Sequence, residues 1–294
     1  MLSTNTQETI NQVKCALNRE LSLYQYANFY RPPSPSVGVE SLSKEIAIDG
    51  KERSHRMKIC TWIFNVIDHC NFLRQTAVIA VDIFDRFMAT RGNRCTPEFA
   101  LLSATTAVFI SAKVNEREGL QADSLAKLSR DQFRESDIKE MEEEILHGLN
   151  WLVHPPTACS FLCPLLQLLP SEVSMDYKNI IFENAQYITE LAVFDSYFLN
   201  YPNSTIGFAA LIICLDYEIM HDVIPLSSKE KFLKKMDEHF QLSQLTSLQK
   251  VQKRLHSVLL HRQHQMEDST NCNHLKHLRH LSSPTKIVSV LSFS

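Results

Sequence analysis

The sequence predicts an all-α protein built from two tandem five-helix bundles. Glycine supplies 6 of the 294 residues, about 2% against a typical ~7%, whereas tight β-turns and phosphate-binding loops both need glycine. Apolar residues recur at helical spacing, and no segment alternates strongly as a strand does. Residues 97–113 and 203–219 are apolar on nearly every face and rich in small side chains. Each is therefore expected in the middle of a bundle, which indicates a repeat of about 100 residues.

The first half of the chain reads as a run of amphipathic helices. They are expected over residues 6–30, 54–69, 74–90, 97–113 and 137–149. A proline cluster, Pro32-Pro33-Ser34-Pro35, ends the first helix and begins a linker to about residue 50. Thr96 before Pro97 favours the start of one helix, and Asp137 with Glu140 has the spacing of a capping box at another.

The second half repeats this pattern after the prolines that follow Trp151. Helices are expected over residues 157–169, 176–198, 203–219, 228–240 and 243–262. Thr157 can cap the first of them, and Ser227 with Glu230 gives a second capping box.

Four parts of the chain follow from this organisation. Residues 263–294 are rich in His, Ser, Thr and Asn with few apolar anchors, so they read as a mostly disordered tail. The predicted parts are an N-terminal helix and linker over 1–50, a first bundle over 51–154, a second bundle over 155–262, and the tail over 263–294.

Charge and composition exclude several classes of function. A net charge of −3 argues against nucleic-acid binding as the main task. No secretory signal and no long uncharged apolar run occur, so the chain is expected in the nucleus or cytoplasm, away from membranes. The motifs of nucleotide-binding, serine-hydrolase and zinc-protease enzymes are absent, so neither catalysis nor a cofactor is expected.

The eight cysteines are scattered and read as reduced, buried thiols. Cys159 and Cys163 lie four residues apart, but no second pair completes a zinc site. In the tail, His274, His277 and His280 with Cys272 could hold a metal if helical, but a tail that binds nothing specific is the better interpretation. No metal site is therefore expected.

Several segments, in order and at family-like spacing, resemble the cyclin box from about residue 50 to residue 157. They are His55-Arg56-Met57-Lys58-Ile59-Cys60-Thr61-Trp62, Ile79-Ala80-Val81 with Asp85-Arg86-Phe87-Met88, Ser111-Ala112-Lys113-Val114-Asn115-Glu116, and Met141-Glu142 with Leu146, Leu149 and Trp151. The resemblance continues more weakly to residue 262 as a degenerate second repeat. The chain is similar to a divergent cyclin, because His55, Thr61 and Asn115 depart from the residues usual in the family.

The resemblance implies a structural role for Arg56 and Asp85, an internal ion pair joining the first and third helices. Two solvated surface charges are the alternative from the residues alone. The apolar neighbours Phe84 and Phe87 favour burial of Asp85.

The resemblance also implies a kinase-binding site at Lys113 and Glu142, which would grip the backbone around the movable helix of a protein kinase. Apolar contacts are expected from Ile110, Val114, Leu146 and Trp151. The alternatives are two ordinary solvated charges and four core residues.

Two further sites are expected from the resemblance and from local sequence. His55, Ile59 and Trp62 share one helix face, which in cyclins docks short Arg-x-Leu peptides of substrates and inhibitors; a packed structural tryptophan is the alternative. Ser283, before Pro284, resembles the acceptor of a proline-directed kinase.

The function that the resemblance implies is that of a regulatory subunit. It would bind and activate a cyclin-dependent protein kinase and help to select substrates in cell-cycle control. Two alternatives stay open, a two-repeat helical transcription factor and a helical scaffold without a kinase.

Overall fold

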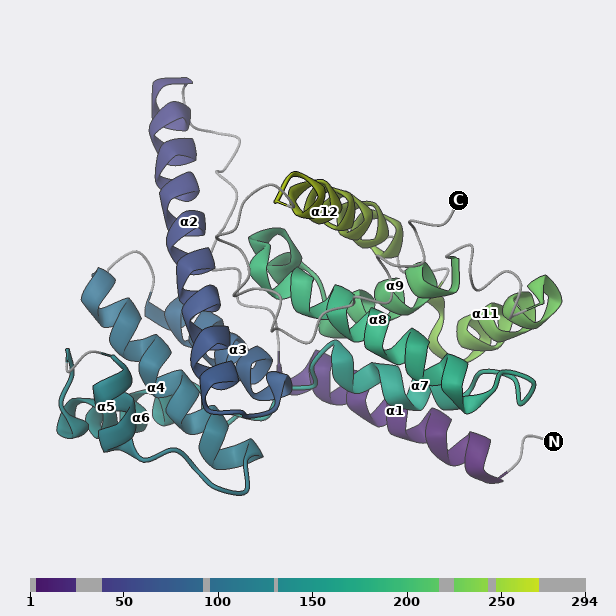
Figure 1. Ribbon diagram of the computed structural model, residues 1–294, viewed down its shortest axis with the longest axis horizontal. Coiled ribbons are helices and arrows are strands. Elements are labelled where there is room, and N and C mark those ends of the chain that lie inside the picture. Colours follow the sequence, from purple (N-terminus) through teal and green to yellow (C-terminus); the bar gives the residue numbers. More distant parts are fainter. Residues whose placement is uncertain are drawn as a thin grey trace. The chain divides into compact units, whose positions relative to one another are not determined.

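A computed structural model describes residues 4–24, 39–91, 96–129, 132–216, 225–242 and 247–269. These residues form helices and no strand, so the prediction of an all-α chain is confirmed (Figure 1). In chain order the elements are α1 (Thr4–Leu23), α2 (Val39–His69), α3 (Arg74–Arg91), α4 (Pro97–Asn115), α5 (Ala122–Leu128), α6 (Glu135–Gly148), η2 (Cys159–Phe161), α7 (Leu162–Gln167), α8 (Met175–Phe194), η3 (Ser196–Asn200), α9 (Asn203–Asp216), α11 (Leu226–Phe240) and α12 (Leu248–Ser269).

Three helix boundaries differ from those expected. Helix α2 begins at Val39 rather than after a linker to residue 50. No proline follows Pro35 in this segment, and the one glycine within the helix, Gly50, costs only about 1 kcal/mol. Helix α12 continues to Ser269, so the first residues of the expected tail are helical. Helix α5 was missed, because seven residues are too few for a clear period. Residues 270–294, and Ser283 with them, lie outside the described residues.

The capping predictions had mixed outcomes. The Thr96 hydroxyl accepts from the Phe99 amide at 3.1 Å, as expected. Asp137 does not begin α6; it is the third residue of that helix, and its carboxylate accepts from the Arg134 amide at 2.8 Å. The capping box at Ser227 was wrong, since α11 begins at Leu226 with no side-chain cap.

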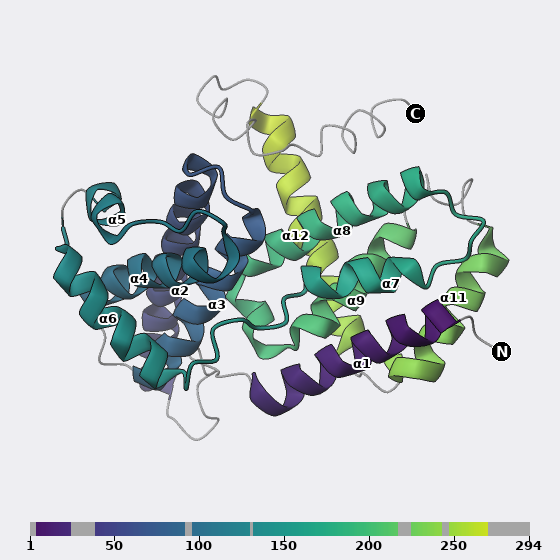
Figure 2. The ribbon, with the colours of Figure 1, turned by 90° about the horizontal axis from the view of Figure 1, so that it is seen from below.

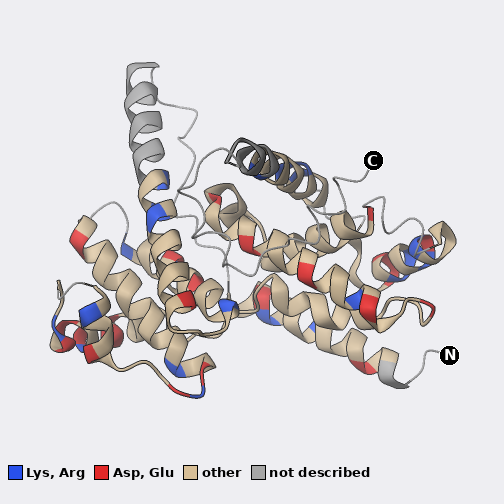
Figure 3. Ribbon diagram, in the orientation of Figure 1, with Lys and Arg blue, Asp and Glu red and all other residues tan. Residues whose placement is uncertain are grey.

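The chain divides into two compact units. The first unit, Leu23–Pro155 with Val193–Asn200, is organised around α3 and α4. Helix α4 packs against α3, α6 and α2, and it is tan along almost its whole length in Figure 3 (Figures 1 and 2). Every residue from Ser103 to Ala112 is buried. A helix apolar on all faces therefore occupies the centre of this unit, as its sequence predicts.

The second unit comprises Met1–Ser22, Pro156–Ala192 and Tyr201–Ser294. Its central helix is α9, which packs against α12, α7 and η2 and is buried over most of its length. Glu20 of α1 is buried and its carboxylate accepts from the Ser204 amide at 3.1 Å. Because the first amides of a helix have no partner within it, Glu20 caps α9 from a distant part of the sequence.

Replacing Gly207 by Ala is expected to destabilise the second unit by about 1–3 kcal/mol. A Cβ atom at Gly207 would lie 2.6 Å from the Ala158 carbonyl oxygen, which belongs to the backbone and cannot turn aside. Urea unfolding measures the change. Gly119→Ala is the control, because its Cβ would meet nothing nearer than 3.9 Å and stability should change by less than about 1 kcal/mol. Equal stability of the two variants would contradict the close approach at Gly207.

The described cysteines are free thiols. Burial raises the pKa of Cys60 and Cys159 to about 12, so both stay protonated near neutral pH. Cys15 and Cys163 are exposed, contrary to the expectation of buried thiols. The described residues hold no group of three or more His, Cys, Asp or Glu side chains placed to bind a metal ion. Among them, too, no helix has both the length and the apolar character needed to cross a membrane.

Candidate functional site

The interior of the first unit contains a bidentate ion pair between α2 and α3. Arg56 Nε lies 2.8 Å from Asp85 Oδ1, and Arg56 Nη2 lies 2.7 Å from Asp85 Oδ2. A third donor of the guanidinium, Nη1, reaches the Val193 carbonyl oxygen at 2.8 Å. The side chain of Arg56 is 2% exposed. The pair therefore joins consecutive helices, not the first and third, and it also holds the end of α8.

A second ion pair lies at the surface of the same unit. Lys113 in the last turn of α4 and Glu142 on α6 approach to 2.7 Å between Nζ and Oε1. Their side chains are 46% and 16% exposed, so both reach solvent. The Lys113 ammonium also lies over the Phe109 ring, 4.4 Å from its centroid. The ring and the carboxylate hold the ammonium in one place, at the edge of the bundle.

Apolar side chains surround this ion pair to different extents. Val114, next to Lys113, is 47% exposed, whereas Leu146, one turn after Glu142, is half-buried against the core. Ile110 is only 2% exposed and faces the interior. Ile110 was expected to contact a partner, and its burial leaves it a supporting core residue instead. A helix this apolar on every face gives no sequence signal for the side that meets solvent.

Trp151 is the most exposed aromatic residue of the described chain, at 65%. It follows α6 with φ of 63°, directly after Asn150 with φ of 50°, and its amide donates to the Leu146 carbonyl at 2.9 Å. Two consecutive non-glycine residues in the left-handed region are strained, and such strain tends to occur at functional sites. The turn directs a large apolar ring outward, with its centroid 6.4 Å from that of the His147 ring.

These residues define the α4–α6 surface: Lys113, Val114, Glu142, Leu146 and Trp151. It presents one cation, one anion and exposed apolar side chains. Such a surface can donate to carbonyls and accept from amides of a partner's backbone while its apolar members exclude water.

Glu116 completes the support of this surface and was not assigned a role from the sequence. Its carboxylate accepts from the Leu73 amide at 3.0 Å and from the Thr76 hydroxyl, so it caps the start of α3. Ser111 donates to the Thr76 carbonyl at 2.7 Å. These bonds hold the end of α4, and Lys113 with it, against α3. The acidic position after Lys113 in the family-like segment was the signal that could have identified Glu116.

The α2 face expected to dock peptides is partly covered. His55 is exposed, while Ile59 and Trp62 are half-buried and pack against the core of the first unit. Thr61 donates to the Met57 carbonyl within the helix. Ser283, the expected phosphorylation site, lies outside the described residues, as do His274, His277 and His280.

Comparison with known families matches most of the chain. The family described as "Cyclin, N-terminal domain" matches residues 38–154, and the one described as "Cyclin, C-terminal domain" matches residues 156–291. The Lys113–Glu142 pair lies inside the first match.

Individual relatives agree with the family match. Cyclin-D3-2 of Arabidopsis thaliana is 28% identical over 210 residues, which cover 70% of this chain and 52% of the relative. G1/S-specific cyclin-E1 of Gallus gallus is 28% identical over 173 residues, 57% of this chain and 42% of the relative. The chain thus spans about half the length of the curated relatives it matches.

A solved structure has a similar fold. The viral cyclin from herpesvirus saimiri superposes with a TM-score of 0.62 at 17% identity, over 85% of this chain and 97% of that one. At this identity the likeness concerns the fold.

Proposed function

The chain belongs to the cyclin family, and we propose that it is the non-catalytic regulatory subunit of a cyclin-dependent protein kinase. One observation carries the proposal. The Lys113–Glu142 pair, 2.7 Å between Nζ and Oε1, lies at the surface of α4 and α6 next to exposed Val114, and exposed Trp151 follows the end of α6. A charge pair set among exposed apolar side chains is the composition expected of a partner-binding surface.

The proposed mechanism is the capture of one conformation of the kinase. A protein kinase aligns its phosphates only when a strand lysine pairs with a glutamate on a mobile helix. Lys113 would donate to carbonyls, and Glu142 would accept from amides, of the backbone around that helix. Val114, Leu146 and Trp151 would bury apolar area against it. Because these contacts form only when the helix is turned inward, binding shifts the kinase towards its active state.

Substrate selection and a role in the cell-division cycle are the finer parts of the proposal. The relatives include proteins named G1/S-specific cyclin-E1 and G2/mitotic-specific cyclin-B2, and these names support a cell-cycle role. The nucleus or cytoplasm is the proposed location. His55, Ile59 and Trp62 lie on one face of α2 and would contact short peptides of substrates through the exposed parts of their side chains.

Affinity capture with the tagged chain tests the proposal. We expect a cyclin-dependent kinase to co-purify with the natural chain and to be lost with Val114→Asp, which buries a carboxylate against the apolar side chains of the partner. Leu226→Asp is the matched control, because Leu226 of α11 is also an exposed apolar residue and lies outside the α4–α6 surface. A kinase retained equally by both variants would contradict the proposed surface. Capture of promoter DNA would favour a helical transcription factor, and capture of no kinase would favour a helical scaffold.

A further inference from the structure

The second unit contains a basic hollow that the proposed kinase surface does not use. Its volume is about 750 Å³, and its walls come from α1, the segment between α7 and α8, α8 itself and α11. Among the described residues that line it, three are lysines, Lys178, Lys231 and Lys235, and none is Asp or Glu. Such a volume falls in the range of small-ligand sites in proteins.

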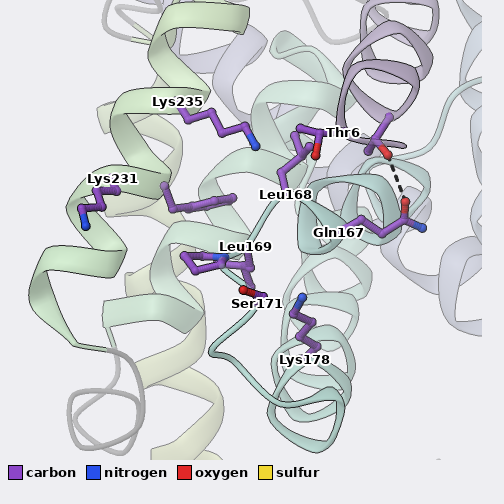
Figure 4. Close-up of a pocket in the computed structure, with 11 residues that line it drawn as sticks. Thr6, Gln167, Leu168, Leu169, Ser171, Lys178, Lys231 and Lys235 are labelled. Atoms are coloured by element: carbon purple, nitrogen blue, oxygen red, sulfur yellow. Dashed lines mark hydrogen bonds between the residues drawn. The ribbon is translucent and has the colours of Figure 1, made fainter. Parts of the chain in front are cut away.

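Two of these lysines converge on the hollow. Figure 4 shows Lys178 of α8 and Lys235 of α11 extending their ammonium groups into it from different sides, with Ser171 on its wall. Lys231, one turn before Lys235, points away from the other two. The cationic part of the site is therefore made by Lys178 and Lys235, held on separate helices. Phe232, on the same helix as Lys235, is buried and also lines the hollow.

Within the part of the chain that the structure describes, no carboxylate forms an ion pair with either ammonium group, although several other surface lysines take part in one. Lys178 and Lys235 are both partly buried. Burial lowers the pKa of Lys235, which means that its charged form is poorly solvated where it stands. An anion in the hollow would restore the solvation that the Lys235 ammonium group has lost.

We propose that this hollow binds a phosphomonoester dianion. Two ammonium groups on different walls match two negative charges, and phosphate oxygens can accept hydrogen bonds from Lys178 and Lys235, with the Ser171 hydroxyl as a further donor on the wall. A carboxylate would neutralise only one of the lysines. The same chemistry can come from a phosphorylated serine or threonine of a protein or from a small phosphorylated metabolite. The hollow belongs to the second unit, whereas the α4–α6 surface belongs to the first. The proposed phosphate site therefore does not rest on the proposed function.

Titration of the full chain, followed by NMR at constant ionic strength, tests the site. The probes are inorganic phosphate, O-phosphoserine, and a glycine pentapeptide with a central phosphoserine, with acetate and the unphosphorylated peptide as references. We expect the phosphorylated probes to bind and Lys178→Gln or Lys235→Gln to weaken them by about tenfold to a hundredfold each. Lys234→Gln is the matched control, because it removes the same charge from α11 outside the hollow. Tighter binding of the peptide than of O-phosphoserine assigns the site to proteins, and equal binding assigns it to small phosphorylated molecules.

Lysine acylation read by mass spectrometry gives a second test on the natural chain, so that the outcome does not depend on the folding of a variant. O-phosphoserine should protect Lys178 and Lys235 from acylation and leave Lys234 reactive. Three results would each overturn the proposal. The first is that no phosphorylated probe binds, and the second is that the double variant Lys178→Gln, Lys235→Gln binds as tightly as the natural chain. The third is that the probe changes the acylation of none of the three lysines.

Discussion

A chain carrying Lys113→Ala together with Glu142→Ala is expected to bind its kinase roughly 30-fold to a few thousand-fold more weakly, while its fold is unchanged. The loss corresponds to about 2–5 kcal/mol, the cost of truncating hydrogen-bonded charges that become buried in an interface. In the free chain the pair is only partly buried, where such a pair contributes about 0–1 kcal/mol to stability. Titration calorimetry with the purified kinase subunit measures the affinity, and thermal unfolding measures the stability.

The control for this prediction is an ion pair on α5. Lys127 and Asp123 form it at 2.7 Å, both are well exposed, and neither belongs to the α4–α6 surface. Replacing both by Ala should leave kinase affinity within about twofold of the natural chain, since exposed pairs contribute little. Equal affinity of the two double variants would show that the kinase binds elsewhere.

Replacing Arg56 by Ala is expected to destabilise the first unit by about 3–5 kcal/mol. The substitution leaves the Asp85 carboxylate buried without the two hydrogen bonds from the guanidinium, and the Val193 carbonyl without its donor. A loss of this size is a large part of the 5–15 kcal/mol that stabilises a typical domain. Hydrogen exchange of α3 peptides, compared with α9 peptides, reports the loss for the first unit by itself.

Two variants separate the ion pair from a general effect of lost charge. Lys127→Ala breaks an exposed pair with Asp123 on α5 and should cost less than about 1 kcal/mol. Arg56→Met combined with Asp85→Leu should recover most of the stability, because removing both charges leaves neither unpaired. A small effect of Arg56→Ala, equal to that of Lys127→Ala, would contradict the buried role of the pair.

Periodicity and composition predicted the helices and the central place of α4 and α9, because burial on all faces leaves a continuous apolar run. The capping predictions succeeded at Thr96, where proline follows at once. They failed at Ser227, because a capping-box spacing also arises by chance in a polar segment. The start of α2 at Val39 was not predictable from the prolines alone, since they exclude helix only up to Pro35.

The charged residues of the candidate site could be predicted from the sequence, whereas the solvent exposure of its apolar residues could not. Lys113 and Glu142 stand in family-like segments, so the resemblance named them, and the structure brings the two together. Ile110 could not be distinguished from Val114, because both lie on a helix that is apolar all round, and only packing shows which faces solvent. The contact of Arg56 with Val193 joins residues far apart in the sequence, and no local pattern encodes it. The left-handed turn at Trp151 likewise has no glycine to mark it.

One measurement decides whether the chain is a kinase activator. It compares the rate at which the captured kinase subunit phosphorylates a peptide substrate by itself with its rate in the presence of saturating purified chain. The proposed mechanism predicts an increase in kcat/KM of at least roughly tenfold, since even ~1.4 kcal/mol of preference for the active conformation has that effect on a kinase that is mostly inactive. The increase should disappear with the Lys113→Ala, Glu142→Ala chain. A kinase that binds the chain and phosphorylates the peptide no faster than it does alone would contradict activation through the α4–α6 surface.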